Sequence, residues 1–560
     1  METWFLILVT ASVSLLLHQA FLNLFFASRN QMIPHPLPPG PPTFPIIGNV
    51  LWLRNSVFQN LEQILCHLHK KLGPMVTIHT GIRPNIIIND RSLAHQALVQ
   101  SGSLFADRPE PLPANKIMKT QHNISSPTYG PTWRLLRRNL ISEILHPSRV
   151  QSYSHARKWV LKILFDSLQL QSKAKTGDPV HVLDHIRHAM FCLLSLMCFG
   201  DKLTQDEIKG IETVLRRLLT GFIGQFTILN FWPRVTKVLL PKKWEKLYKL
   251  RKDQEDVLVP FIRARKKAKE EKIDDYILAY VDTLFDLELP DEKRKLDEGE
   301  IVSLASEFLN SGTDTTSTAL QWIMANLVKY PNVQEKLFLE IKGVMGKTEE
   351  EEIGEEDLQT MPYLKAVILE GLRRHPPGHF LLPHRATDDT VLGEFLVPKD
   401  GTINFMVADI GRDPKVWEDP MAFKPERFLK SNINDDGSMM MEVFDIMGRR
   451  EIKMMPFGAG RRPERFLKSN INDDGSMMME VFDIMGRREI KMMPFGAGRR
   501  ICPALGLALF HLEYFVANLV WKFEWKAMEG DICLEEKQEF TTVMKTPLQA
   551  KISPRKRRVC

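Results

Sequence analysis

A cysteine near the carboxyl end of the chain stands in a context that suits metal ligation. Cys502 follows the glycine-rich run Phe495-Gly496-Ala497-Gly498-Arg499-Arg500-Ile501 and precedes an apolar stretch at 504–519. We expect that stretch to form a buried helix, and a cysteine at a helix start lies where backbone N–H groups and the helix dipole favour a thiolate. Arg500 adds positive charge, and Phe495 can keep water out. The alternative, a structural cysteine, explains neither the glycines nor the arginine pair.

Residues 297–329 are predicted to form one long helix. Asp297 and Glu300 fit a capping box, Lys329 lies in the last turn, and Pro331 follows the end. Apolar residues fill both halves of the segment.

The middle of this helix is polar. Residues 311–318 read Ser-Gly-Thr-Asp-Thr-Thr-Ser-Thr, which are mostly poor helix formers. A local inconsistency of this kind is typical of a functional site. Gly312 would let another group approach the backbone closely. Asp314 and Thr315 offer a carboxylate beside a hydroxyl, which suits the passage of protons into a dry pocket. A threonine-rich helix break is the alternative.

A second helix is predicted at 361–374, and Pro376 and Pro377 stop it. Glu370 and Arg373 are three residues apart, so they meet on one face of this helix. Considered alone, such a pair is most often a surface salt bridge that contributes a few tenths of a kcal/mol. The pair therefore indicates no function without further support.

Together these features resemble the signature motifs of the cytochromes P450, in the order in which that family has them. Phe495, Gly498, Arg500 and Cys502 resemble its haem-binding motif, Phe-x-x-Gly-x-Arg-x-Cys. The other matches are the oxygen-activation motif at Gly312, Asp314 and Thr315, the Glu-x-x-Arg motif at Glu370 and Arg373 with Pro-Glu-Arg-Phe after it, and the haem-propionate partners Trp133, Arg137 and Arg385.

The resemblance covers nearly the whole chain. It is similar to plant microsomal members, in the branch that contains families 77 and 89. Ser311 stands where the family usually has Ala or Gly, and Ala504 stands where Gly is usual. Both replacements are small residues, so they put little in doubt.

The resemblance implies a mainly α-helical fold with a small β region, preceded by one amino-terminal transmembrane helix. It implies haem b (iron protoporphyrin IX) between the long helix and the cysteine loop, with Cys502 as the metal ligand. Asp314 and Thr315 are implied as catalytic groups. Cofactor contacts are implied for Trp133, Arg137, Arg385, Phe495, Gly498, Arg500 and Cys502. A structural role is implied for Glu370 and Arg373 with an arginine of Pro-Glu-Arg-Phe.

The implied activity is that of a haem-thiolate monooxygenase. Such an enzyme activates O2 with electrons from an NADPH-cytochrome P450 reductase and inserts one oxygen atom into an apolar small-molecule substrate. Arg134 and Arg138 are candidate contacts for the reductase. Two alternatives stay open. One is a haem-thiolate isomerase or dehydratase, against which the retention of Asp314 and Thr315 argues. The other is an inactive or haem-deficient product of the repeat described below.

The amino terminus is predicted to be a membrane anchor. Residues 4–26 are almost wholly apolar, enough for a helix to cross a hydrocarbon core of roughly 30 Å, and a cleaved secretory signal is the alternative. Glu2 precedes this segment and Arg29 follows it, which places the bulk of the chain on the cytoplasmic side. We predict a single-pass protein of the endoplasmic reticulum membrane with its catalytic domain facing the cytosol. Its parts are an anchor at 1–28, a proline-rich linker at 29–45 and a haem-thiolate domain at 46–560.

The composition is that of a folded globular protein, with 44% hydrophobic and 26% charged residues. The formal net charge of +7 is spread along the chain and forms no basic stripe, so we expect no nucleic-acid partner. Membrane lipid or an acidic protein fits this charge. The six cysteines lack the spacing of a disulfide framework or a zinc site, which indicates a reducing compartment.

A perfect direct repeat lies ahead of the cysteine. Residues 425–462 are identical to residues 463–500, so the second copy adds 38 residues. Perfect identity indicates a recent duplication, or an error in assembling the gene or its transcript. Only the second copy leads into Cys502, because Glu464 stands at the corresponding place after the first.

We expect the chain to follow the family's path up to about Arg427, with the additional residues bulging out before Met492. Loop entropy does not forbid this, since doubling a loop costs only about 0.6 kcal/mol. Arg427 and Arg465 are then competitors for pairing with Glu370 and Arg373.

Overall fold

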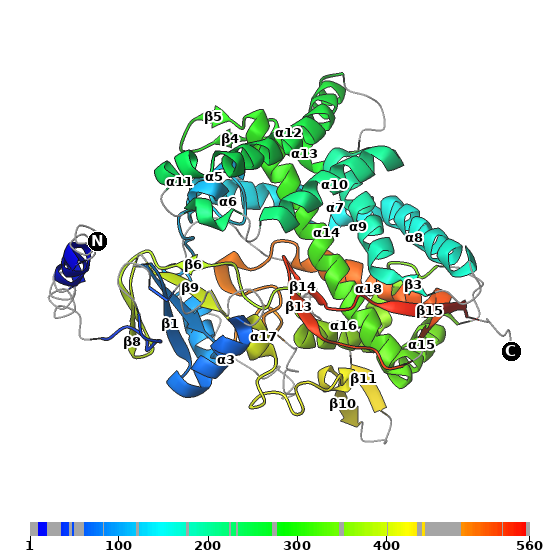
Figure 1. The fold of residues 1–560 in the computed structure, drawn as a ribbon. Coiled ribbons are helices and arrows are strands. Elements are labelled where there is room, and N and C mark those ends of the chain that lie inside the picture. The colour runs from blue at the N-terminus through cyan, green and yellow to red at the C-terminus, as the bar shows by residue number, and fades with distance from the viewer. Residues whose placement is uncertain are drawn as a thin grey trace, which may run out of the picture.

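The computed structural model describes residues 9–19, 35–43, 48–49, 61–81, 83–118, 122–174, 179–222, 226–230, 233–271, 277–346, 352–399, 401–433, 439–442, 483–528 and 530–555. Over these residues the fold is mainly helical with several small sheets, which confirms the predicted fold class (Figure 1). The helices, in chain order, are α3 (Leu61–Leu72), α4 (Arg91–His95), α5 (Pro113–Met118), α6 (Pro131–Asn139), α7 (Pro147–Ser152), α8 (Ser154–Ala174), α9 (Val182–Phe199), α10 (Gln205–Phe222), α11 (Pro233–Leu239), α12 (Pro241–Glu270), α13 (Tyr280–Leu284), α14 (Glu298–Lys329), α15 (Pro331–Met345), α16 (Pro362–Arg374), α17 (Val407–Gly411) and α18 (Leu505–Lys522).

The largest sheet has four strands in the order β1-β2-β9-β6. β1 and β2 are antiparallel, β2 and β9 are parallel, and β9 and β6 are antiparallel. The strands are β1 (Met75–Thr80), β2 (Arg83–Ile88), β3 (Val180–His181), β4 (Glu288–Leu289), β5 (Arg294–Lys295), β6 (His384–Arg385), β7 (Thr390–Leu392), β8 (Phe395–Val397), β9 (Thr402–Phe405), β10 (Lys430–Ile433), β11 (Met439–Glu442), β12 (Phe523–Ala527), β13 (Glu536–Gln538), β14 (Thr542–Met544) and β15 (Gln549–Pro554). In Figure 1 this sheet lies to one side of the helices.

The central helix of the fold is α14, and it begins after the N-cap residue Asp297, as predicted. The Asp297 carboxylate accepts from Glu300 N at 2.8 Å, and the Glu300 carboxylate accepts from Asp297 N at 2.7 Å, so the capping box is formed. α14 packs against α9 and α18, and most of its residues are buried (Figure 1). An apolar helix surrounded by other helices gains its stability from this packing.

The cysteine loop is held between two packed cores. The larger core contains α8, α9, α14, α16 and α18, and the four-stranded sheet forms the main part of a second core. Ile490, Met493 and Ala497 of the cysteine-loop region belong to this second core, whereas Met492 belongs to the first. Side chains of this region therefore contact both cores.

Within the described residues, α9 is the one helix that is long and apolar enough to cross a membrane, and 83% of it is buried inside the protein. That burial identifies α9 as a core helix. Of the predicted anchor, residues 9–19 are helical, with Leu16 and Leu17 exposed. The rest of the segment at 4–26 lies outside the described residues.

Both copies of the repeat contribute to the described fold. The first copy begins with the short helix η5 (Pro425–Phe428) and continues into the paired strands β10 and β11. Residues 434–438 and 443–482 lie outside the described residues. The chain is described again from residue 483, and Ile484, Ile490 and Met492 of the second copy are buried.

Candidate functional site

The loop that precedes α18 holds Cys502 by its main chain. Cys502 N donates to Phe495 O at 2.8 Å, and Ile501 N donates to Gly498 O at 3.2 Å. These bonds close the loop around the short helix η6 (Gly498–Arg500) and bring Phe495 close to the cysteine. Cys502 as a residue is partly exposed, and it lies three positions before Leu505, where α18 begins, which confirms the predicted cysteine at a helix start.

Gly498 is required by the space around it. Its φ is +67°, a left-handed conformation, and a Cβ there would lie 1.8 Å from Leu98 O. Gly496 also has a positive φ of +73°, but its nearest neighbour would be 3.6 Å from a Cβ. Gly498 therefore serves both the turn and the close approach of the chain at Leu98, whereas Gly496 serves only the turn.

Positive charge lies beside the cysteine. Arg137 of α6 donates from Nη2 to Ile501 O at 2.5 Å. Burial raises the pKa of the Cys502 thiol, and the Ala504 N–H and the Arg137 charge act against that rise. The Ala504 N–H and Arg137 of α6 thus supply two of the stabilising interactions that a thiolate needs, although the desolvation of the sulfur is the larger effect.

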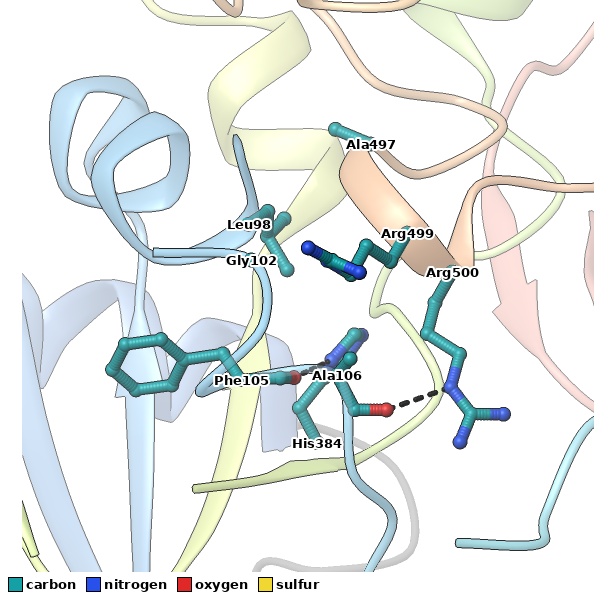
Figure 2. Close-up of a pocket in the computed structure, with 8 residues that line it drawn as sticks. All are labelled: Leu98, Gly102, Phe105, Ala106, His384, Ala497, Arg499 and Arg500. Carbon is teal, nitrogen blue, oxygen red and sulfur yellow. Dashed lines mark hydrogen bonds between the residues drawn. The ribbon is translucent and has the colours of Figure 1, made fainter. Parts of the chain in front are cut away.

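Arg500 reaches away from the loop into the protein. Its Nε donates to Ala106 O at 2.7 Å (Figure 2) and its Nη2 donates to Pro127 O at 2.7 Å. Its guanidinium lies over the Trp133 ring, with Cζ 4.2 Å from the centroid. Nη1 is buried, and it has no acceptor among the described residues. Arg500 also lines the small hollow of Figure 2, together with Leu98 and Ala497, and this hollow has no room for a water-sized molecule.

Two of the predicted propionate partners, Trp133 and Arg385, have protein contacts of their own. The Trp133 indole N–H donates to Ile124 O at 3.0 Å. Arg385 of β6 forms an ion pair with Asp107, with Nη2 and Oδ2 2.6 Å apart. Their roles as cofactor contacts stay predictions. The guanidinium of Arg385 is already paired with the carboxylate of Asp107.

The polar run of α14 opens on one side. Ser311 is exposed although it lies in the middle of a helix whose flanks are buried, and Gly312 and Thr315 are partly exposed. Thr315 Oγ1 donates to Ser311 O at 2.6 Å, one turn back. On the opposite flank, Leu194 of α9 packs so closely on Gly312 that a Cβ would lie 2.7 Å from its methyl carbon. Glycine thus permits the approach of α9, which is the close backbone contact that the sequence predicts.

Asp314 points to another flank of α14 than Thr315, since consecutive helical residues are turned about 100° from each other. Its Oδ1 lies 3.6 Å from Arg187 Nε of α9, and its Oδ2 accepts from Thr541 Oγ1 at 3.3 Å. Burial raises the pKa of the Asp314 carboxyl, and the Arg187 charge opposes the rise. A carboxyl with a raised pKa holds its proton closer to neutral pH, which suits proton transfer.

The pair formed by Glu370 and Arg373 is fully buried, unlike the surface salt bridge that the spacing alone would favour. Arg373 donates to both carboxylate oxygens, at 2.7 and 2.9 Å. Arg427 Nε of the first repeat copy donates to Glu370 Oε1 at 3.1 Å. Arg465, the equivalent residue of the second copy, lies outside the described residues.

Three residues of this region were not found from the sequence. Arg108 is buried and donates to Leu382 O and Pro383 O, both at 2.8 Å, beside β6. Arg187 and Thr541 contact Asp314. No sequence pattern indicates Arg187 or Thr541, because each is far in sequence from Asp314. A local signal exists only for Arg108. The charged pair Asp107-Arg108 directly follows Phe105-Ala106, and charged residues that are buried beside apolar ones need partners.

The donor set fits haem b. A partly exposed cysteine at a helix start can ligate iron, and the buried Arg500 Nη1 lacks an acceptor that a propionate oxygen would provide. No group of three or more metal-ligating side chains occurs among the described residues. A ligand set of one cysteine is nevertheless sufficient for an iron that a porphyrin already holds.

Comparisons with known proteins identify the family of the chain. The sequence model of the family described as "Cytochrome P450" matches residues 38–463 and 462–554. The two matched segments meet where the second repeat copy begins. The family resemblance inferred from the motifs is therefore confirmed over almost the entire chain.

Individual relatives align along the full length. The chain is 50% identical over 556 residues to "Cytochrome P450 89A9" of Arabidopsis thaliana, covering 97% of this chain and 98% of that protein. It is 26% identical to "Cytochrome P450 98A1" of Sorghum bicolor, with 97% and 96% covered. It is also 26% identical to "Phenylacetaldehyde oxime monooxygenase CYP71AN24" of Prunus mume, with 90% and 86% covered.

Proposed function

Because this chain belongs to the cytochrome P450 family, we propose that it inserts one oxygen atom from O2 into an apolar small-molecule substrate, with electrons from an NADPH-cytochrome P450 reductase. The family's members hold haem b through a cysteine thiolate, and one relative of this chain is named a monooxygenase. The observation that carries the proposal is the main-chain closure of the cysteine loop, in which Cys502 N donates to Phe495 O.

Cys502 is the proposed metal ligand. When bound, the haem supplies O2 activation, and a thiolate ligand favours cleavage of the O–O bond. Phe495 and Gly498 shape the loop that presents the sulfur, and Arg137 supplies charge beside it. The main-chain bonds that close the loop reduce the conformational entropy that presenting the sulfur would otherwise cost.

Asp314 and Thr315 are the proposed proton-transfer residues. The Asp314 carboxyl can be protonated or ionised, and it lies on the flank of α14 that Arg187 and Thr541 contact. Thr315 lies on the neighbouring, more open flank, where its hydroxyl bonds to Ser311 O. Since the two side chains point in different directions, a bridging water or a rotation of the carboxyl is needed to connect them.

Arg137, Arg385, Arg500 and Trp133 are the proposed contacts of the haem propionates. Arg500 is the best supported of them, because its buried Nη1 lacks an acceptor among the described residues. Trp133 contributes its ring face under Arg500 instead of its N–H, which Ile124 O already accepts. Arg385 would have to share its guanidinium between Asp107 and a propionate.

Glu370, Arg373 and Arg427 are proposed to support the site structurally. The buried carboxylate holds two arginines, and Arg373 continues to Gly411 O at 2.9 Å and Pro420 O at 2.8 Å. This network ties α16 to the chain that follows α17. Arg465 is the competitor in the second copy, and we assign it no contact.

Exposed arginines on α6 support the proposed reductase partner, and the apolar amino-terminal segment supports the proposed membrane location. Arg134 and Arg138 are exposed on α6, the helix that also carries Arg137, which supports a basic docking face for the reductase. The apolar segment at 4–26 supports a single-pass anchor in the endoplasmic reticulum membrane, contact with membrane lipid and a cytosolic catalytic domain. We retain the division into an anchor at 1–28, a linker at 29–45 and a catalytic domain at 46–560.

The test is the carbon monoxide difference spectrum of the reduced full-length protein in membranes. A red-shifted Soret band is expected from the thiolate. Cys502→Ser should abolish this band, whereas Cys533→Ser, a matched change at an exposed cysteine, should leave it unchanged. A band that survives in Cys502→Ser would overturn the assignment of the ligand.

Dependence on NADPH and O2 separates the monooxygenase from its alternatives. Oxidation of NADPH by the protein with its reductase should consume O2 and should stop in the Cys502→Ser variant. Turnover of a substrate without either reagent would favour an isomerase or a dehydratase. A haem-free wild-type protein would favour an inactive product of the repeat.

A further inference from the structure

The turn between β13 and β14 reaches α14 through the side chain of Thr541. The two strands pair as an antiparallel hairpin, and Thr541 lies in the turn with 3% of its surface exposed. Its Oγ1 lies 3.3 Å from Asp314 Oδ2 and 2.9 Å from Thr318 Oγ1, a buried hydroxyl of α14. A residue 227 positions further along the chain thus contacts the carboxyl group in the polar run.

The number of hydrogens fixes the direction of these bonds. An ionised carboxylate can only accept, so Thr541 must use its single hydroxyl hydrogen on Asp314. Thr318 must then donate to Thr541 Oγ1, which gives two hydroxyls in series that point at the carboxylate. If Asp314 takes up a proton, the same chain can reverse, because each hydroxyl can both donate and accept.

The hairpin is held in place without the Thr541 hydroxyl. Trp322 Nε1 of α14 donates to Thr542 O at 2.8 Å, and Thr542 N donates to Pro377 O at 2.7 Å. At the other end of the hairpin, Glu536 contacts His375 Nδ1 at 2.7 Å. Loss of the hydroxyl would therefore remove one contact of Asp314 and leave the turn where it is.

We propose that Thr541 is a positioning residue for Asp314: its hydroxyl, with Thr318 behind it, fixes the carboxyl beside Arg187 and controls when that group can release a proton toward the O2 site. The inference rests on the proposed role of Asp314. It adds to that role a residue from the carboxyl-terminal hairpin, outside the polar run itself.

Charged groups from three elements face Asp314. Arg187 comes from α9, Arg216 from α10, and Glu539 from the hairpin turn. Burial raises the pKa of Asp314, the two arginines and the Thr541 hydrogen bond oppose the rise, and Glu539 adds to it. Removal of the hydroxyl should therefore raise the pKa further, with both arginines still in place.

The experiment follows the protonation of Asp314 in the full-length protein by infrared difference spectroscopy over a pH series. The carbonyl band of the protonated carboxyl is assigned by its absence in Asp314→Asn. In Thr541→Val, which keeps the shape of the side chain, the midpoint should rise by about one pH unit, a tenfold change in proton affinity. Thr541→Ser should restore the wild-type midpoint to within about 0.3 unit.

Two further variants separate positioning from a general disturbance of the hairpin. Thr542→Val removes the neighbouring buried hydroxyl, which bonds to Gln538 Oε1, and should leave the midpoint unchanged. Thr318→Val removes only the hydroxyl behind Thr541 and should raise the midpoint by less than half as much. An unchanged midpoint in Thr541→Val, or an equal shift in Thr542→Val or Thr541→Ser, would overturn the inference.

The carbon monoxide difference spectrum is recorded for every variant. A wild-type protein without the red-shifted band would contradict the proposed function. The midpoint of Asp314 protonation could still be compared between the wild type and Thr541→Val, so the inference about Thr541 would be tested separately. A normal band together with an unmoved midpoint in Thr541→Val would defeat only the inference about Thr541.

Discussion

Arg427 Nε lies 3.1 Å from Glu370 Oε1, so the first copy of the repeat contributes to the buried network of α16. Trp417 joins the two copies. Its ring lies under Arg427, with Cζ 5.9 Å from the centroid, and its Nε1 donates to Lys491 O of the second copy at 3.1 Å. The network arginine thus comes from one copy and the cysteine loop from the other.

Removal of the two equivalent arginines should have unequal effects. Arg427→Ala deletes a hydrogen bond to a buried carboxylate, which costs about 1.5–3 kcal/mol, although Arg373 still neutralises the charge. We expect a clear loss of haem content in Arg427→Ala and none in Arg465→Ala. Haem per protein, measured after purification, decides. Equal losses in both variants would contradict the assignment of the first copy.

Deletion of one repeat copy should preserve the site. Because the copies are identical and adjacent, deletion of 425–462 or of 463–500 gives the same chain, with one Pro-Glu-Arg-Phe and one loop leading into Cys502. We expect equal or higher haem content and less aggregation, since the deletion also removes one Met-Met-Met run. Gel filtration of the detergent-extracted protein with absorbance at the Soret band measures both. Loss of haem on deletion would show that both copies are needed.

Substitution of the two loop glycines should separate strain from collision. Gly496→Ala carries only the cost of a positive φ, about 1–2 kcal/mol. Gly498→Ala carries a similar strain and in addition a collision with Leu98 O, for which overpacking adds about 1–3 kcal/mol. Thermal unfolding followed at the Soret band should therefore give a lower midpoint for Gly498→Ala. Equal midpoints would mean that Leu98 moves aside freely.

His384 should make the protein less stable in acid. It is 3% exposed, its Nδ1 bonds to Phe105 O at 2.7 Å (Figure 2), and burial beside Arg108 and Arg500 lowers its pKa to about 3. Below the unfolded value of 6.5, the unfolded chain binds a proton that the folded protein does not bind. The full stability is therefore present above pH 6.5, and this residue removes about 1.4 kcal/mol per pH unit as the pH falls toward 3.

The matched variant for this effect is His384→Gln, which keeps a hydrogen-bond donor but does not titrate. Denaturant unfolding at pH 7.5 and at two values below 6.5 should show a shallower loss of stability in the variant than in the wild type. Parallel losses in the two proteins would mean that other groups cause the acid sensitivity.

Residue types and spacing were enough to predict the features that depend on neighbours along the chain. Three such features join residues that are at most seven positions apart. They are the capping box of Asp297 and Glu300, the pair of Glu370 and Arg373, and the glycine loop before Cys502. Hydrogen bonds and sterics over that distance leave few alternatives, so residue types and spacing predict them. The family and its cofactor followed from the same motifs.

The contacts between distant segments became known from the three-dimensional fold alone. Arg427 and Arg465 have identical neighbours over a whole repeat copy, so no local pattern can distinguish them, and the choice depends on which one the chain path brings to Glu370. Thr541 gives no local sign that it contacts Asp314. Burial of the pair on α16 likewise depends on what packs over it. Such contacts arise from the packing of whole elements, which consecutive residues do not encode.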